Sequence, residues 1–332
     1  MVMNGVGRDQ LQLVDLPDPV PGRREVLVRM RAASLNFRDI LTVDGKYGRM
    51  QKTKGLVPLS DGAGEIVQVG SDASRFRVGQ RVVGCFFPDW RRGSPNEPEM
   101  YRALGGLIDG VAAELRVFGE NEILPIPDGM AFNEAACTPC AAVTAWHAVR
   151  GVGAAGPEKI VLTQGTGGVS LFALQFALAA GARVVATSSS DEKLELLRKL
   201  GASETINYRV EAEWARAARK LVGRGLDLVV DIGGTTTFDQ SVRACAPGAT
   251  IAVIGVIGGV THQVNFPIIA MNSLRLQGIA VGNQEHHADL LNVMQHHQIK
   301  PVIDRTFALE ELPEALAYLE LGKHTGKVCI SI

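Results

Sequence analysis

A glycine-rich stretch in the middle of the chain constrains the fold more than any other feature. Residues 159–181 read KIVLTQGTGGVSLFALQFALAAG, a short apolar run followed by glycines and then by apolar residues at helical spacing. Such a run is typical of a strand buried on both faces, and the glycines let the backbone turn tightly and approach a ligand. Strand, glycine turn and helix predict a site where amides at the helix start bind a pyrophosphate. Because Ser170 replaces the third glycine of a strict G-x-G-x-x-G motif, the prediction depends on this context more than on the motif.

Apolar strands and helical segments alternate after this unit. The predicted strands are 183–187, 204–206, 227–231 and 250–254, and the predicted helices are 191–200, 211–222 and 236–246. A further apolar strand, 274–281, closes the region. This alternation predicts an α/β domain with a doubly wound parallel sheet of the Rossmann type.

The front of the chain has a different pattern. From residue 11 to about 124 it shows short β-like segments separated by proline and glycine, such as LQLVDL and EVLVRMRAAS, which predict a small β-rich domain. Two long connections, 36–59 and 88–109, are expected to line an active site. We predict a β-rich first domain over 1–126, a dinucleotide-binding domain over 127–282 and a return segment, 283–332, that completes the first domain.

Composition excludes several classes of partner. The chain has 34 basic and 35 acidic residues, so no electrostatic footprint for nucleic acid or an anionic membrane is present. No stretch approaches the roughly 20 apolar residues that span a bilayer, and no charged leader opens the chain, so we expect a cytoplasmic protein. Five scattered cysteines argue against a disulfide framework, and the pair Cys137 and Cys140 is read as ordinary buried thiols.

The order of these parts resembles the medium-chain dehydrogenase/reductase superfamily over nearly the whole chain. The segments that carry the resemblance include ASLNFRDIL (33–41), PLSDGAGEIVQVG (58–70), QGTGGVSLFALQFA (164–177) and TGKVCI (325–330). The resemblance implies a GroES-like β-rich catalytic domain beside the Rossmann domain. It also implies a dinucleotide cofactor and a small-molecule substrate.

The resemblance further indicates a member without a metal. Zinc alcohol dehydrogenases of this superfamily carry cysteine and histidine ligands at places that look like Asn36, Ser60 with Asp61, and Cys140 here. These residues make a poor site for an ion that prefers imidazole and thiolate. The structural zinc lobe is missing too, since residues 88–110 contain no cysteine. The chain therefore resembles the zinc-independent, quinone oxidoreductase-like branch of alcohol dehydrogenases.

The end of the second Rossmann strand predicts the coenzyme preference. NAD-preferring domains have an acidic residue there, whereas this chain reads TSSS over 187–190. Hydroxyls at Ser188 and Ser189, with Lys193, can bind a 2′-phosphate, so NADPH is favoured over NADH. By resemblance Tyr208 contacts the same phosphate. The alternative is that the serines only cap the helix that begins at Asp191.

Other cofactor contacts are predicted around the glycine turn and at strand ends. The resemblance places Thr144 and Asn36 near the nicotinamide and Lys327 at the phosphates, and Gly233 follows a strand end where open α/β sheets bind ligands. The remaining predicted cofactor residues are Gly165, Thr166, Gly167, Gly168, Val169, Ile254, Gly255 and Val256.

Without zinc, a side chain or water must stabilise the oxygen that gains negative charge as hydride is transferred. The candidates are Asn36, Tyr47 and Arg38. For Asn36 the alternative is a turn or helix-cap role, for Tyr47 a solvent-facing loop position, and for Arg38 a pairing with Asp39.

Two functions remain open at this point. The first is a zinc-independent, NADPH-dependent oxidoreductase acting on an aldehyde, ketone or alcohol, a quinone or an activated alkene. The second is a catalytically quiet NADPH-binding protein with a structural or sensing role. The segment 273–281 at the sheet edge predicts a homodimer through paired edge strands, unless another part of the chain covers that edge.

Overall fold

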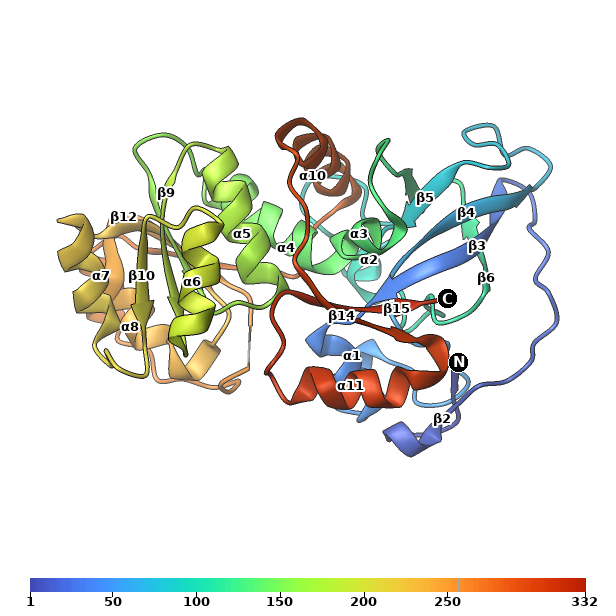
Figure 1. The fold of residues 1–332 in the computed structure, drawn as a ribbon, viewed down its shortest axis with the longest axis horizontal. Coiled ribbons are helices and arrows are strands. Elements are labelled where there is room, and N and C mark those ends of the chain that lie inside the picture. The colour runs from blue at the N-terminus through green and yellow to red at the C-terminus, as the bar shows by residue number, and fades with distance from the viewer. Residues whose placement is uncertain (256) are drawn as a thin grey trace. The chain divides into compact units, whose positions relative to one another are not determined.

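The computed structural model describes residues 1–255 and 257–332, and it separates into two compact units (Figure 1). Unit 1 comprises Met1–Val143 and Gly282–Ile332, and unit 2 comprises Thr144–Val281. The first boundary therefore falls later in the chain than the predicted one after residue 126. None of the helices in the described ranges combines the length and apolarity needed to cross a membrane.

Unit 2 is built on a sheet of six parallel strands. In spatial order these are β10 (Glu204–Asn207), β9 (Arg183–Ser188), β8 (Ile160–Gln164), β11 (Leu226–Asp231), β12 (Cys245–Val253) and β13 (Arg275–Gly278). Numbered within the unit, the order is 3-2-1-4-5-6, which is the order of doubly wound dinucleotide-binding domains. The predicted Rossmann sheet is confirmed.

The helices of unit 2 follow the strands as the alternation predicts. They are α5 (Gly168–Ala179), α6 (Asp191–Lys199), α7 (Trp214–Val222), the short turn η5 (Gly234–Thr236), α8 (Phe238–Ala244) and α9 (Phe266–Met271). Helix α9 is an element that the sequence pattern did not indicate. Four neighbouring strands contribute fully buried residues to the core, namely Leu162, Val185, Val229 and Ile251.

Unit 1 contains a seven-stranded sheet. Its path is β14 (Ile303–Ala308), β15 (Lys327–Ser331), β3 (Glu25–Ser34), β4 (Asp61–Val69), β5 (Arg81–Gly84) and β7 (Ile123–Pro125), with β6 (Leu115–Gly119) paired to β3. The β-rich character of this part is confirmed. Strands β14 and β15 come from the C-terminal segment, and β15 pairs antiparallel with β3 through Cys329 and Ser34.

Helices and helical turns of three to 14 residues connect the strands of unit 1. They are η1 (Arg8–Gln10), α1 (Phe37–Val43), η2 (Gly48–Met50), α2 (Glu97–Tyr101), α3 (Phe132–Ala136), the wide π-type turn η3 (Thr138–Ala142), α10 (Gln284–His297), η6 (Leu309–Glu311) and α11 (Leu312–Glu320). Residues 127–143 belong to this unit because α3 contacts both β3 and β4. Helix α4 (Val143–Trp146) and the π-type turn η4 (His147–Val152) then lead to β8.

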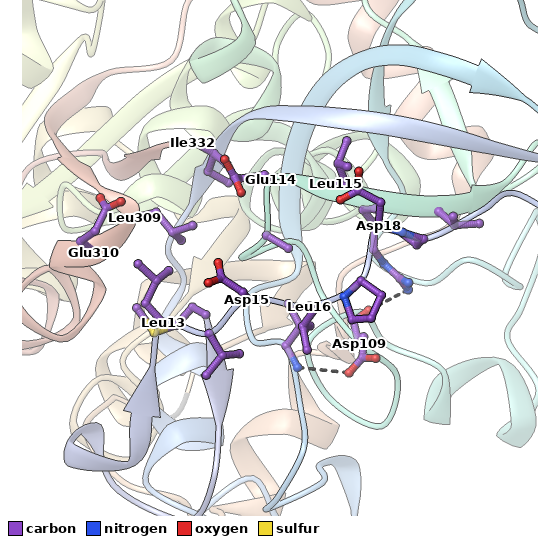
Figure 2. A pocket seen from close by; sticks show the side chains of 18 of the residues that line it. Leu13, Asp15, Leu16, Asp18, Asp109, Glu114, Leu115, Leu309, Glu310 and Ile332 are labelled. Carbon is purple, nitrogen blue, oxygen red and sulfur yellow. Dashed lines mark hydrogen bonds between the residues drawn. The ribbon is translucent and has the colours of Figure 1, made fainter.

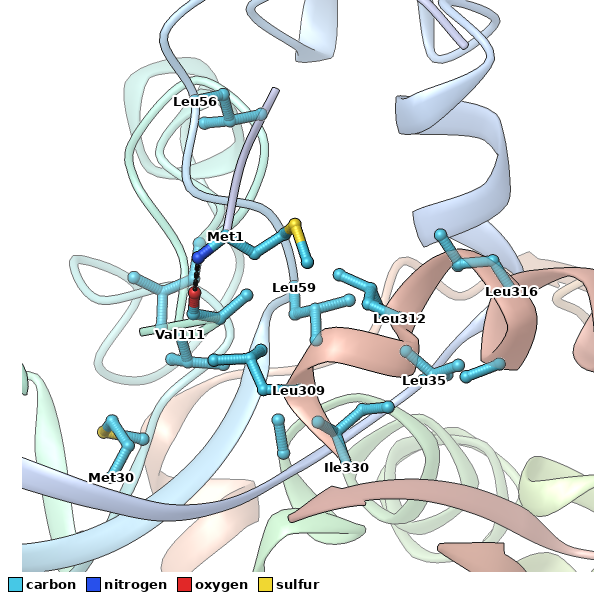
Figure 3. Packing of buried hydrophobic residues seen from close by; sticks show 14 of the residues in the cluster. Met1, Met30, Leu35, Leu56, Leu59, Val111, Leu309, Leu312, Leu316 and Ile330 are labelled. Atoms are coloured by element: carbon cyan, nitrogen blue, oxygen red, sulfur yellow. Dashed lines mark hydrogen bonds between the residues drawn. The ribbon is translucent and has the colours of Figure 1, made fainter. Parts of the chain in front are cut away.

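The core of unit 1 gathers residues from both ends of the chain. Figure 3 shows Leu35 and Leu59 beside Leu312 and Ile330, and all four are buried. The Met1 ammonium donates a hydrogen bond of 2.8 Å to the carbonyl of Ala112 in the same region. Burial of this apolar surface stabilises the unit at roughly 25 cal/mol per Å².

The opening segment departs from the prediction. Of the predicted strand LQLVDL only Leu11–Gln12 forms a strand, β2, which pairs with β1 (Val2–Met3). The residues that follow are not in a strand, since the prolines at 17, 19 and 21 lack the amide hydrogen that a sheet ladder requires. This segment borders a cavity of about 760 Å³ whose labelled lining includes Asp15, Asp18 and Glu114 (Figure 2).

Candidate functional site

The glycine turn of unit 2 has the shape that an anion site requires. Strand β8 is buried throughout, and Gly165 after it adopts φ +77°, a left-handed conformation that favours glycine. A Cβ at Gly167 would meet no atom within 4 Å, and one at Gly165 would meet only Ile232, at 3.9 Å. Helix α5 then begins without a side-chain cap. Its first amides are therefore available to a pyrophosphate, as Gly165, Thr166, Gly167, Gly168 and Val169 were predicted to provide.

Ser170 explains how the chain departs from the strict glycine motif. Its side chain is buried, and its hydroxyl donates a hydrogen bond of 2.6 Å to the carbonyl of Gln164 at the end of β8. The serine therefore ties the helix start to the strand end, where a third glycine would only allow close packing.

The predicted 2′-phosphate residues lie at the adjoining ends of β9 and β10. The Tyr208 amide donates to the Ser188 carbonyl at 3.1 Å, which places these two predicted residues side by side. Ser190 caps α6, because its Oγ accepts from the Lys193 amide at 3.4 Å. The capping alternative thus holds for Ser190, whereas Ser188 is buried and Ser189 half-buried.

A carboxylate also lies near this strand end. Asp191, the first residue of α6, accepts a hydrogen bond of 2.9 Å from the Asn207 side chain. The sequence pattern shows no acid within β9 itself, and Asp191 follows three residues after its last residue, Ser188. The carboxylate of Asp191 is thus hydrogen-bonded to the last residue of β10.

A buried polar network supports the ends of β8 and β11. Asp231 accepts from the Gly234 amide at 3.0 Å, from Thr237 Oγ1 at 2.8 Å and from Ser241 Oγ at 2.5 Å. Gln164 donates to Ser241 Oγ at 2.8 Å. The network fixes the turn at Gly233 and Gly234. Sequence reasoning missed Gln164 and Ser241, although polar residues that end a buried apolar strand are a usable signal.

The remaining predicted cofactor residues of unit 2 lie in different settings. A Cβ at Gly255 would stand 1.8 Å from the Ile232 carbonyl oxygen, so only glycine fits there. The amide of Ile254 donates to the Asp231 carbonyl at 2.9 Å, and Thr144 is buried in α4. The predicted residue Val256 lies outside the described residues.

In unit 1 the candidate Asn36 sits at the centre of a buried polar cluster. It precedes α1 as the N-cap residue, and its amide donates to Asp39 Oδ2 at 2.7 Å. Lys327 Nζ donates to Asn36 Oδ1 at 2.5 Å and to the Leu35 carbonyl at 2.6 Å. Asn36 thus occupies the N-cap position proposed as the alternative, but its side chain makes no cap hydrogen bond to the helix and accepts from Lys327 instead. Lys327, predicted at the cofactor phosphates, has its ammonium group in this cluster.

Asp61 is the second acid of the cluster. It accepts from Ser60 Oγ at 2.6 Å and from the Cys140 amide at 3.0 Å. Burial raises the pKa of Asp61, and the Lys327 charge partly opposes this. Burial likewise raises the pKa of the Cys140 thiol.

Asp39 is the one carboxyl group within α1, and it is buried. Burial raises its pKa from 3.8 to about 6, the charge of Arg38 lowers it and the charge of Asp61 raises it. Sequence reasoning considered Asp39 only as a partner of Arg38. Its position three residues after Asn36 is the capping-box signal that could have identified it.

Arg38 and Tyr47 are brought together. The Arg38 guanidinium lies 4.8 Å from the centroid of the Tyr47 ring and 5.4 Å from that of Phe86. Its Nη1 donates to the Leu104 carbonyl at 2.9 Å and lies 3.4 Å from Asp39 Oδ1. Arg38 is buried and Tyr47 half-buried, so Tyr47 is not a freely solvent-facing loop residue.

The donor set around Asn36 does not match a zinc site. Asn36 Oδ1 is bonded to an ammonium group, and both Asp61 oxygens accept hydrogen bonds from protein groups. Across residues 1–255 and 257–332, no three His, Cys, Asp or Glu side chains are grouped so that they could hold a metal ion.

Comparison with known proteins identifies the family. Residues 22–128 match the model of the alcohol dehydrogenase GroES-like domain, and residues 168–296 match the model of the zinc-binding dehydrogenase family. A zinc-type alcohol dehydrogenase-like protein of Schizosaccharomyces pombe is 40% identical, over 98% of this chain and 96% of that protein. A quinone oxidoreductase of Pseudomonas aeruginosa is 32% identical, over 98% of this chain and 96% of that protein.

Solved structures agree with this result. A putative alcohol dehydrogenase from Sinorhizobium meliloti is 37% identical, with a TM-score of 0.93 over 100% of this chain and 98% of that chain. Other similar structures are described as NAD-dependent or as a complex with NADPH. With the Rossmann sheet, the glycine turn and the β-rich unit, these matches establish that the chain belongs to the medium-chain dehydrogenase/reductase superfamily, as an alcohol dehydrogenase- and quinone oxidoreductase-like oxidoreductase.

Proposed function

We propose that the protein is a zinc-independent, NADPH-dependent oxidoreductase. Its substrate is a small aldehyde, ketone or alcohol, a quinone or an activated alkene. The observation that carries the proposal is the buried cluster of Asn36, Asp61 and Lys327, which offers fixed charge and hydrogen-bond donors. By resemblance, Asn36 and Asp61 stand where zinc members carry metal ligands. The acryloyl-coenzyme A reductase among the relatives, 28% identical, supports the activated-alkene class.

The zinc-independent part of the proposal is supported by the chemistry of the donors. Zinc prefers imidazole nitrogen and thiolate sulfur, and a thiol must lose its proton to bind. Burial raises the pKa of Cys140, which disfavours its thiolate, and the Lys327 ammonium already binds Asn36. We expect metal analysis of the purified protein to find no stoichiometric zinc. One zinc per chain, lost together with activity on chelation, would contradict this.

The NADPH preference is supported by the groups at the ends of β9 and β10. Ser188, Ser189, Lys193 and Tyr208 lie there, and Asp191 is bonded to Asn207. Hydroxyls and an ammonium group suit a phosphate, since charge-assisted hydrogen bonds are stronger than neutral ones.

The cofactor, when bound, supplies the hydride, and the chain supplies orientation and charge stabilisation. Asn36 presents Nδ2 as a hydrogen-bond donor for the oxygen that gains negative charge. Tyr47 is the second candidate donor, and Arg38 is the positive charge against its ring. The turn at Gly165 and the start of α5 would hold the pyrophosphate of the cofactor.

A turnover screen tests the proposal. Purified protein is assayed with NADPH against quinones, enones, aldehydes and ketones, and with NADP⁺ against alcohols. We expect turnover on at least one class that Asn36→Ala lowers about 100-fold, the scale for loss of one oxyanion donor. NADPH binding without turnover on any class would instead favour a catalytically quiet binding protein.

A further inference from the structure

We propose that Lys327 is a positioning residue that fixes the side-chain amide of Asn36, so that its NH₂ end is presented to the substrate oxygen. The proposal rests on the proposed function, in which Asn36 is the donor. It assigns Lys327 to the substrate side of the site instead of to the cofactor phosphates.

The first step is the hydrogen bond between the two side chains. Lys327 Nζ lies 2.5 Å from Asn36 Oδ1, and the ammonium group has only donors. An asparagine amide has an oxygen end that accepts and a nitrogen end that donates. Rotating the Asn36 amide by half a turn would place its NH₂ against the ammonium, donor against donor. Lys327 therefore selects one of the two amide orientations.

The second step is that Lys327 is itself held. Its Nζ donates to the Leu35 carbonyl at 2.6 Å, and only 3% of the residue is exposed. Its backbone belongs to β15, which pairs with β3 two residues further on, where Cys329 faces Ser34. A phosphate contact would require the ammonium to break two short hydrogen bonds in a buried site.

The third step is the free end of the amide. Asn36 is nine-tenths buried, and its Nδ2 makes no hydrogen bond of ordinary length with the described residues. The amide lies near enough to Asp61 to lower the pKa of that carboxyl, which burial otherwise raises. The NH₂ group has two N–H donors, and the interaction with Asp61 occupies only one of them, so the other is left for a ligand acceptor. The backbone N–H of Asn36 donates a hydrogen bond to Asp39 Oδ2, which fixes the backbone of Asn36.

A double-mutant cycle tests the proposal. The variants are Lys327→Met, Asn36→Ala and the double variant, with Lys323→Met at an exposed lysine as the control. For each we measure kcat and KM with the best substrate of the screen, and the Kd of NADPH by fluorescence. We expect Lys327→Met to lower kcat about 10- to 100-fold, the range for a misplaced catalytic group, with the NADPH Kd changed less than about threefold. In the Asn36→Ala background the same substitution should change kcat less than about threefold, because Lys327 acts through Asn36.

Two results would overturn the proposal. A rise in the NADPH Kd of about tenfold or more, with kcat unchanged, would place Lys327 at the phosphates. Losses in kcat that multiply in the double variant would show that Lys327 acts independently of Asn36. If Lys327→Met does not fold, Lys327→Arg replaces it in the same cycle, because it retains the buried positive charge that Asp61 and Asp39 face.

A spectroscopic measurement tests the positioning role of Lys327 independently of whether the proposed catalytic function is correct. The side-chain amide signal of Asn36 in a ¹⁵N–¹H spectrum is identified by its loss in Asn36→Ala. It should shift in Lys327→Arg and stay in place in Lys323→Arg, whether or not the protein turns over any substrate. An unmoved signal in Lys327→Arg would overturn the positioning role, whereas a failed turnover screen overturns only the function.

Discussion

At the scale of single residues, the buried carboxyl groups of unit 1 and the partly exposed residues near the ends of β9 and β10 are governed by different physical effects. Asp39 and Asp61 are desolvated, so burial dominates their protonation. Lys193 is half-buried and Tyr208 is exposed, so both side chains can be reached from solvent by a phosphate group. Each setting gives a separate test.

Asp39 is expected to make stability depend on pH. Its folded-state pKa of about 6 lies above the unfolded value of 3.8, so the folded state binds the proton more tightly. The buried charge therefore destabilises the fold above pH 6 by on the order of 3 kcal/mol, and this cost disappears as pH falls toward 4. Asp39→Asn removes the titration, so the stability of the wild type relative to this variant should rise as pH falls from 6 to 4.

Urea denaturation across this pH range measures the difference. Asp128→Asn, at an exposed position, is the control and should run parallel to the wild type. A constant difference between the wild type and Asp39→Asn from pH 7 to pH 4 would show that Asp39 is not the titrating group.

Lys193 is expected to select the coenzyme. Lys193→Ala should raise the Kd of NADPH about tenfold to hundredfold and leave that of NADH nearly unchanged, because a charge-assisted hydrogen bond contributes roughly 1.5 to 3 kcal/mol. Lys199→Ala, at an exposed position on the same helix, is the matched control. Equal losses for both coenzymes would assign Lys193 to another contact.

At the scale of elements, the two glycines of the turn between β8 and α5 are needed for different reasons. Gly165 needs its positive φ, whereas Gly167 has φ −76° and open space in front of it. Gly165→Ala should therefore lower stability by about 1 to 2 kcal/mol and weaken NADPH binding. Gly167→Ala should weaken binding alone, because its methyl group enters only the ligand space.

Thermal unfolding and NADPH titration of the two variants make this comparison. Wild-type affinity in Gly167→Ala would mean that the pyrophosphate does not approach this backbone.

At the scale of the whole molecule, the protein is expected to form a homodimer through the β13 edge of the unit 2 sheet. All four residues of β13 are exposed, and α9 leaves Phe266 and Met271 at 74% and 87% exposure. An uncovered edge beside exposed apolar side chains favours pairing with a second copy. The Ile279 amide donates to the Val253 carbonyl of β12, so by the two-residue period the Leu276 amide faces outward.

Leu276→Pro should therefore split the dimer while leaving the contacts to β12 in place. Leu276→Thr retains the outward amide and should remain dimeric. Sedimentation of the wild type as a monomer of 35.5 kDa at micromolar concentration would refute the dimer.

The sequence by itself determined the class of the fold and the location of the cofactor turn. Periodicity and glycine spacing are local properties, so β3, β9 and α6 were predicted within a residue or two, and so was the turn at Gly165. The prediction of a strand over LQLVDL was largely wrong, since only Leu11–Gln12 forms one. Alternation of apolar residues does not show whether a partner strand is available, and the prolines downstream cannot donate to one.

Tertiary structure alone decided how the candidate site is assembled. Lys327 bonds Asn36 across 291 positions of the chain, and the Cys140 amide bonds Asp61 across 79. The sheet pairing of β15 with β3 creates the first contact, and no local pattern encodes such a pairing. The raised pKa of Asp39 has the same origin, since desolvation depends on what surrounds a carboxyl group in space and not on its neighbours in sequence.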